Sequence, residues 1–150
     1  MKIFLFAFAC LSTRFCCAQS TGKKSNSEQE IRTLMNDWMV AMKKRDKNTL
    51  NQIVAPEFKL DGVYPFNGIV VPRELWMNNG LNNLKVDSVH YYNMKVDVID
   101  NVAIVQSKFY WSGSFRDKPF IDSTSILVDT WMKRKQNWQV VSRIRVDKPE

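Results

Sequence analysis

The spacing of apolar residues divides the chain into a helical first half and a second half of strands. After Ser27, which forms an S-x-x-E capping box with Glu30, apolar side chains recur every three or four residues, and this spacing predicts a helix. These side chains belong to Ile31, Leu34, Met35, Trp38, Met39 and Met42. A shorter helix is expected between Asp46, which can cap it, and Pro56, and a third helix is expected to begin at Pro72.

From Val86 onward the apolar residues follow a period of two, which is typical of strands. Strands are expected at residues 89–99, 102–112, 120–133 and 138–146. Short turns at Asp100-Asn101 and at Gln136-Asn137 join the outer pairs, and a longer loop is expected between the two middle strands. Because strands joined by short turns are antiparallel neighbours, the sequence predicts an α+β domain whose N-terminal helices pack on one face of a bent antiparallel sheet.

The beginning of the chain has the layout of a secretory signal peptide. Lys2 gives it a positive start, residues 3–11 form an apolar run, and Ala18 is a small residue at the expected cut. The apolar run is too short to span a membrane, so we expect export to the periplasm or secretion. The expected divisions are a signal peptide at 1–19, a flexible lead-in at 20–27 and one domain at 28–147.

Composition narrows the chemistry of this domain. The 150 residues include a single histidine, His90, which excludes a multi-histidine metal site. All three cysteines lie within residues 1–19, so the mature chain has neither a disulfide nor a thiol nucleophile. No glycine motif for phosphate binding occurs, and we expect no cofactor and no metal. Loss of Lys2 and Arg14 reduces the formal charge from +7 to +5, and without a basic stripe interleaved with exposed rings no nucleic-acid partner is expected.

Short segments at both ends of the predicted domain match a known family. They are Trp38-Met39-Val40-Ala41-Met42 with Arg45-Asp46, Pro56-Glu57-Phe58 with Asp61-Gly62, Thr130-Trp131-Met132-Lys133-Arg134, and Asn137-Trp138-Gln139-Val140-Val141-Ser142. Through them the chain resembles the nuclear transport factor 2-like superfamily, especially its small uncharacterised bacterial members. The resemblance implies the cone-shaped α+β fold shared by ketosteroid isomerase, scytalone dehydratase, SnoaL-like cyclases and the association domain of calmodulin-dependent kinase II. Because this fold hosts enzymes, ligand binders and assembly modules, it leaves the function open.

The catalytic members of the superfamily match this chain poorly. By resemblance to ketosteroid isomerase, the oxyanion-hole tyrosine falls on Trp38 and the general-base aspartate on Gly62. Asp61 is one position away, and in a strand that shift turns a side chain to the opposite face. The histidine-centred members need a His–Asp pair, and His90 has no evident partner. In the kinase association domain an arginine of the last strand lines the cavity, and Arg145 falls near that position.

Asp61 and His90 are nevertheless the candidate catalytic residues. Asp61 comes just after Phe58 and Leu60, in a short strand expected before the third helix, where it is either a general base in an apolar pocket or a turn residue. In a regular strand His90 shares one face with every second residue that follows it, namely Tyr92, Met94, Val96 and Val98. This is the expected inward face. There it is either an acid–base group or a hydrogen-bonded core residue.

Asp129 is a second carboxylate of interest, because it shares a strand face with Leu127 and Trp131. A carboxylate with such neighbours is either buried against a partner such as Arg143 or Arg145, or exposed beside them. We favour the structural pairing.

Three functions follow from these observations. The first is an exported protein that holds a small apolar or weakly anionic ligand in a cone cavity lined by rings. Its expected ligand-binding residues are Trp38, Tyr64, Trp76, Tyr92, Trp111 and Arg145. The second is a cofactor-free lyase, isomerase or hydrolase that uses Asp61 with His90 or Tyr92. The third is a structural dimerisation module with a vestigial cavity. A homodimer through the outer sheet face is expected, because the strands are apolar on both faces.

Overall fold

The computed structural model describes residues 21–62 and 68–146. Its elements in chain order are α1 (Thr21–Lys44), α2 (Lys47–Ile53), β1 (Val54–Asp61), β2 (Val71–Pro72), α3 (Arg73–Asn82), β3 (Leu84–Ile99), β4 (Val102–Phe115), β5 (Lys118–Arg134) and β6 (Asn137–Val146). The signal peptide expected at 1–19 and the candidate residue Tyr64 lie outside the described residues. Within them, no helix is both long enough and apolar enough to cross a membrane.

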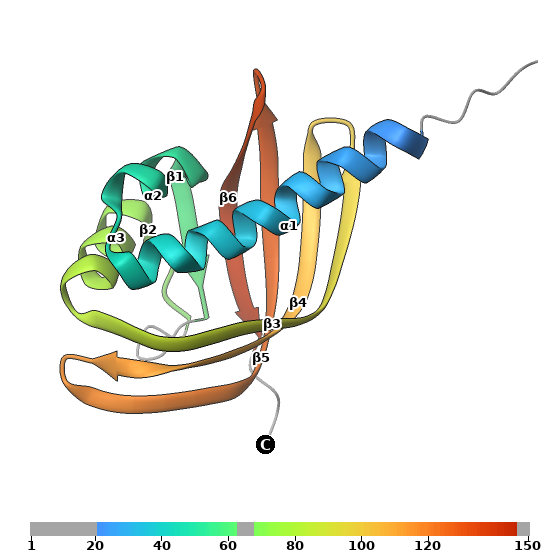
Figure 1. The fold of residues 1–150 in the computed structure, drawn as a ribbon. Coiled ribbons are helices and arrows are strands. Elements are labelled where there is room, and N and C mark those ends of the chain that lie inside the picture. The colour runs from blue at the N-terminus through green and yellow to red at the C-terminus, as the bar shows by residue number, and fades with distance from the viewer. Residues whose placement is uncertain (1–20, 63–67, 147–150) are drawn as a thin grey trace, which may run out of the picture.

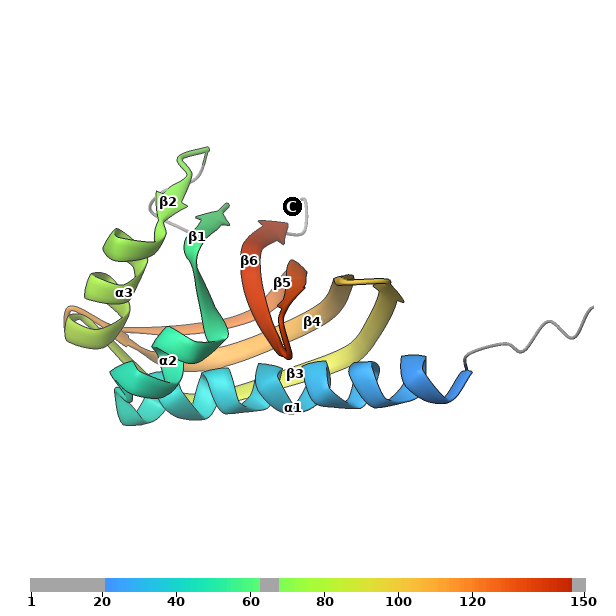
Figure 2. The ribbon, with the colours of Figure 1, turned by 90° about the horizontal axis from the view of Figure 1, so that it is seen from above.

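The strands form one six-stranded sheet in the order β2-β1-β6-β5-β4-β3. The last four follow one another as antiparallel neighbours, which confirms the predicted meander, and β1 pairs with β6 in parallel. β3, β4 and β5 bend strongly along their length, while α1 crosses one side of the sheet and α3 stands at one end (Figure 1, Figure 2). The predicted α+β class, with helices packed on a bent and mostly antiparallel sheet, is therefore confirmed.

The core lies between α1 and the sheet face toward it. Along β4 the side chains alternate between exposed and buried from Val102 to Phe109, because successive residues of a strand point to opposite faces. α1 contributes its apolar stripe at the predicted spacing. The buried apolar side chains of this layer are Ile31, Met35, Trp38, Met39, Met42, Ala103, Val105, Phe109, Leu127, Trp131 and Val140.

α1 begins seven residues earlier than the capping box predicts, since Ser27 as the cap makes Glu28 the first helical residue. Its first residue is Thr21, so Ser27 lies inside the helix and the expected flexible lead-in is helical from Thr21 onward. Arg32 forms an i,i+4 ion pair of 2.7 Å with Glu28. Its Nη2 also donates a hydrogen bond of 3.0 Å to the carbonyl oxygen of Met94 in β3. The hydrogen bond to Met94 attaches α1 to β3 near the residue where the apolar stripe begins.

Tight turns join the strands of the meander. Asp100-Asn101 connects β3 to β4, as predicted. The longer loop expected after β4 is instead a two-residue turn formed by Arg116 and Asp117, with φ values of 50° and 63°. Two consecutive positive φ values match the right-handed twist of the flanking strands, so both strands extend further than the sequence pattern indicates.

A β-bulge at Asn93 decides which side chains of β3 face the core. Between Tyr92 and Lys95 the pairing with β4 shifts, so that β3 carries one residue more than β4. Asn93 has a φ of 50°, which asparagine adopts more readily than most residues. The extra residue reverses the alternation, so His90 and Tyr92 lie on the outer face whereas Tyr91 packs against the core. The prediction that His90 shares the inward face with the apolar residues that follow it is therefore wrong.

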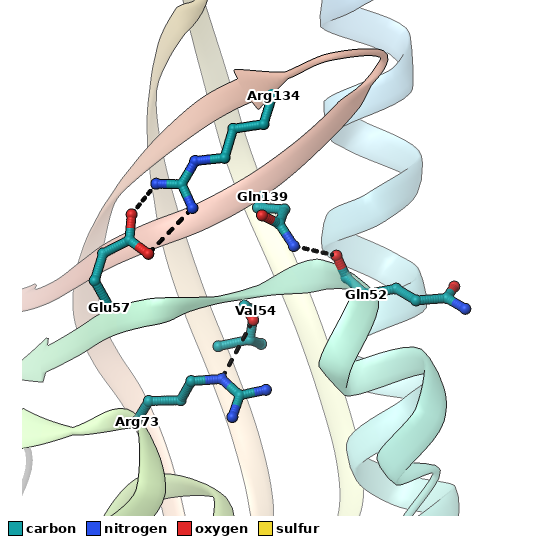
Figure 3. Close-up of polar contacts among 6 residues, drawn as sticks. All are labelled: Gln52, Val54, Glu57, Arg73, Arg134 and Gln139. Atoms are coloured by element: carbon teal, nitrogen blue, oxygen red, sulfur yellow. Dashed lines mark hydrogen bonds and ion pairs between the residues drawn. The ribbon is translucent and has the colours of Figure 1, made fainter.

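Side-chain contacts attach β1 where its backbone pairing is irregular. The parallel ladder with β6 is interrupted after Val54. Beyond that point Glu57 forms an ion pair with Arg134 at the end of β5. Before it, Gln139 of β6 donates a hydrogen bond to the carbonyl oxygen of Gln52 at the end of α2 (Figure 3). Arg73 of α3 donates to the Val54 carbonyl oxygen. The hydrogen bonds from Arg134 lower the pKa of Glu57.

Candidate functional site

A cavity of about 580 Å³ lies where α3 and the end of α1 meet the inner face of the sheet. Its walls come from elements that are far apart in the chain: Met42 of α1, Leu60 of β1, Trp76 of α3, Phe109 of β4 and Leu127 of β5 all line it. Cavities of this size and apolar character commonly hold small molecules. The bend of the sheet therefore creates a site of the kind predicted for the cone.

Aromatic rings form one continuous wall of the cavity. The ring of Trp111 lies between Phe109 and Phe120, with centroid distances of 5.4 Å and 4.6 Å. Trp76 lines the cavity from α3. Such tilted ring pairs are favourable beyond the apolar area they bury, so the wall is a stable surface on which a flat apolar ligand can pack.

The carboxylate of Asp122 in β5 contacts the ring wall at Trp111, and we call this side of the wall its polar end. Asp122 Oδ2 accepts a hydrogen bond of 3.1 Å from Trp111 Nε1 and lies 2.9 Å from Nη2 of Arg145. Ser125 Oγ donates to the same carboxylate at 3.2 Å. Between Phe109 and Trp111 the pairing of β4 with β5 shifts, and this bulge brings Asp122 and Ser125 to one face. Sequence reasoning missed Asp122, because regular alternation does not place it beside Ser125.

A second ion pair lies deeper, between Arg143 of β6 and Asp129 of β5. Nε and Nη2 of Arg143 donate to the two carboxylate oxygens at 2.6 Å and 2.8 Å. Asp129 is 0% exposed and Arg143 is 7% exposed. Burial acts to lower the pKa of Arg143, but the charge and hydrogen bonds of Asp129 outweigh burial and hold that pKa above its usual range. The predicted burial of Asp129 against an arginine of the last strand is confirmed.

The Arg143 guanidinium has two aromatic neighbours. It lies over the ring of Trp38, with Cζ 3.9 Å from the ring centroid, and Nη2 donates to the hydroxyl of Tyr91 at 3.3 Å. Burial raises the pKa of the Tyr91 hydroxyl, and nearby Asp129 raises it further, while Arg143 opposes the change. Tyr91 therefore stays neutral and acts as a fixed hydrogen-bonding partner of the guanidinium.

Basic side chains outnumber acidic ones in the cavity lining. The exposed Arg116 and Lys118 line it together with Arg143 and Arg145, against one carboxylate, Asp122. The basic side chains still outnumber the acidic ones when Asp129, the buried partner of Arg143, is also counted. Such a lining favours a neutral or negatively charged ligand over a cation.

The structure brings together only part of the predicted ligand-binding set. Trp76, Trp111 and Arg145 line the cavity. Trp38 is fully buried in the core beside Trp76 and does not line the cavity, so its assignment as a ligand contact is wrong. Tyr92 is 52% exposed on the outer face, which also contradicts its assignment.

The candidate catalytic residues lie away from the cavity. At the end of β1, Leu60 lines the cavity opposite Arg143, whereas Asp61 pairs with the exposed Ile144 and has the opposite orientation. His90 is on the outer face and contacts Ser88 at 3.3 Å. The predicted combination of Asp61 with His90 or Tyr92 in one pocket is therefore wrong. Among the described residues, no group of three or more potential metal-ligating side chains occurs.

Comparison with known proteins supports the fold of this chain and gives no information on its function. No protein-family model matches the sequence, and no curated protein matches it. A crystal structure of an NTF2-like protein from Cytophaga hutchinsonii matches with a TM-score of 0.72 at 14% identity, covering 82% of this chain and 99% of that chain. An NTF2-like protein from Rhodospirillum rubrum matches with a TM-score of 0.69 at 14% identity, covering 79% and 98%.

A third similar structure is that of a kinase hub. The hub of the calmodulin-dependent kinase II of S. rosetta matches with a TM-score of 0.61 at 14% identity, covering 80% of this chain and 95% of that chain. At such identities the likeness establishes the arrangement of the backbone and not the chemistry. It agrees with the arrangement of helices and strands described above. The chain has the nuclear transport factor 2-like fold.

Proposed function

We propose that the protein binds a small, largely apolar ligand, neutral or weakly anionic, in the cavity beneath α3. The observation that carries this proposal is the cavity of about 580 Å³, with its ring wall and its positive excess of charge. An apolar pocket with a few fixed polar groups is the usual form of a small-molecule site. The hydrogen bond that Asp122 accepts from Trp111 and its ion pair with Arg145 hold this part of the wall in place before a ligand arrives.

Binding is favoured over the alternative functions. A lyase, isomerase or hydrolase that used Asp61 with His90 would need both groups at one opening, and these two residues do not line the cavity. Asp122 and Asp129, the carboxylates nearest the cavity, are each engaged by an arginine, which opposes a role as general base. A vestigial cavity would not need a fixed polar end.

Replacing Trp76 by alanine is expected to weaken binding of the fluorescent probe 8-anilinonaphthalene-1-sulfonate at least about tenfold. The substitution removes a large ring from the cavity lining, and with it much of the apolar area against which the probe packs. Fluorescence titration at a temperature where both proteins are folded measures the effect. The matched control is Tyr92→Ala, which removes an exposed ring from the outer face and should leave the affinity unchanged. Equal affinities of the Trp76→Ala variant and the wild type would argue against the cavity as the site.

We further propose that two copies associate through the outer face of the sheet. On this face Ile104 of β4, Met132 of β5 and Ile144 of β6 are all exposed, and the helices pack on the opposite face. Exposed apolar side chains that gather on one face often mark an interaction surface. A second copy of the chain covers it with the same residues, because a twofold interface is self-complementary.

Light scattering at micromolar concentration is expected to give the mass of a dimer. Ile104→Asp places a charge in the middle of the proposed interface and should give a monomer with the same circular dichroism spectrum. Leu75→Asp is the matched control, because Leu75 is also exposed but lies on α3. A wild-type protein that scatters as a monomer contradicts the dimer.

We also propose that the protein is exported, because residues 1–19 have the charge and hydropathy pattern of a signal peptide. The intact mass of protein purified from its host is expected to correspond to a chain that begins at Gln19 or Ser20. A soluble cytoplasmic protein that keeps Met1 would contradict export.

A further inference from the structure

The guanidinium of Arg143 is fixed on one edge and open on the other. Asp129 receives two hydrogen bonds from Nε and Nη2, Nη2 also donates to Tyr91, and the Trp38 ring covers one face of the plane. Among the described residues, every hydrogen bond of Arg143 comes from these two nitrogens. Nη1 carries two N–H donors, and neither has a protein acceptor there.

These open donors belong to a nearly buried side chain that lines the cavity. Arg143 is 7% exposed, and it contributes to the cavity lining. A purely apolar ligand packed over Nη1 would remove water from both donors and leave them unpaired. A ligand with an oxygen acceptor at this position satisfies them instead, and a hydrogen bond to a charged donor is stronger than a neutral one.

Arg145 is a poorer position for an anionic group, although it lies in the same lining. Its guanidinium is 2.9 Å from Asp122, which itself lines the cavity. An anion placed beside Arg145 is therefore repelled by the negative charge of Asp122. Asp129 differs because it is 0% exposed and is held against the opposite edge of the Arg143 guanidinium. An anion at Nη1 is screened from Asp129 by the guanidinium itself.

The remaining charges of the cavity lining favour a ligand with a carboxylate over a ligand with a neutral acceptor. Arg116 and Lys118 are exposed and add positive charge that no carboxylate of the lining balances. The rings of Trp111 and Phe120 provide the surface for an apolar body. We infer that the ligand is an apolar monocarboxylate whose carboxylate accepts hydrogen bonds from Nη1 of Arg143. This inference rests on the proposed ligand-binding function and names its ligand class.

Three probes with one ring system test the inference: naphthalene-2-acetate, its amide, and 2-ethylnaphthalene. Their affinities for the wild-type protein are measured by fluorescence titration at neutral pH and low salt. We expect the carboxylate to bind about tenfold to a hundredfold more tightly than the hydrocarbon, because it adds a charge-assisted hydrogen bond at a nearly buried donor. The amide, which has a carbonyl acceptor but no charge, is expected to fall between them.

The double variant Asp129→Asn/Arg143→Gln removes the donor without leaving a buried charge unpaired. We expect it to lose the preference for the carboxylate over 2-ethylnaphthalene. Its matched control is Glu57→Gln/Arg134→Gln, which removes an ion pair of the same charges outside the cavity and should keep the preference. If the double variant does not melt cooperatively, Arg143→Lys replaces it, since an ammonium group still pairs with Asp129 but lacks Nη1.

The outcomes separate this inference from the function on which it rests. If the wild type binds all three probes equally, the inference is wrong while ligand binding stands. The inference is also wrong if the double variant keeps the preference and Arg145→Gln removes it. If none of the probes binds and 8-anilinonaphthalene-1-sulfonate does not bind either, the proposed function itself fails.

Discussion

Replacing Asp129 by alanine is expected to lower the free energy of unfolding by about 3–5 kcal/mol, because removing one partner of a buried ion pair leaves the other charge uncompensated. Asp129 is 0% exposed, and both of its oxygens accept hydrogen bonds from Arg143. Its charge helps to hold the pKa of Arg143 above the usual range, so the arginine stays protonated at any pH at which the protein folds. Chemical denaturation monitored by circular dichroism measures the loss.

An exposed ion pair supplies the control for this substitution. Glu57→Ala removes the carboxylate that pairs with Arg134, and both side chains are largely in contact with water. Pairs of this kind contribute about 0–1 kcal/mol, so this variant should unfold near the wild-type midpoint. If Asp129→Ala is no more destabilising than Glu57→Ala, the deep pair does not have the role assigned to it.

Replacing Trp38 by alanine is expected to cost about 3–5 kcal/mol of unfolding free energy, the range for removal of a large buried ring. Trp38 is fully buried, with ring centroids of Phe58, Trp76 and Trp131 at 5.7 Å, 5.6 Å and 6.4 Å. It also carries the guanidinium of Arg143 on its face. Guanidinium chloride denaturation measures the cost, with the slope of the transition as a check on two-state behaviour.

The comparison with Trp76 separates a core ring from a cavity ring. Trp76 is only partly buried and lines the cavity, so Trp76→Ala should cost about 1–2 kcal/mol while it weakens probe binding. A Trp38→Ala variant that keeps its stability but loses probe binding would reverse the two assignments.

Much of the fold could be predicted from the sequence, because it depends on patterns that are local. The apolar stripe of α1, the cap at Asp46 and the change to a period of two all correspond to elements of the structure. Asp46 accepts hydrogen bonds from the backbone N–H groups of Asn48 and Thr49, as its position before a helix indicates. The turn at Asp100 was also predictable, since aspartate tolerates a positive φ.

The candidate site was less predictable, because β-bulges move side chains from one face to the other. The bulge at Asn93 places Tyr91 rather than His90 or Tyr92 toward the core, and no glycine marks it in the sequence. The shift opposite Trp111 brings Asp122 to the cavity in the same way. Since each bulge adds one residue, an alternation read from a regular strand is reversed beyond it.

The predictions were more accurate for side chains whose orientation does not depend on a β-bulge. Trp76 and Trp111 line the cavity as predicted, and so does Arg145 of the last strand. Burial of Asp129 against an arginine of the last strand was predicted from the apolar neighbours of the carboxylate, while the choice between Arg143 and Arg145 was left open. The open nitrogen of Arg143 could not be inferred from the sequence, because it depends on which edge of the guanidinium Asp129 occupies.

A crystal structure of the protein with 8-anilinonaphthalene-1-sulfonate tests the central claim, ligand binding in the cavity, most directly. We expect electron density for the probe inside the cavity, with its rings against Trp76 and Trp111 and its sulfonate toward β6. Density confined to the outer face of the sheet, with the cavity empty at saturating probe, would contradict it.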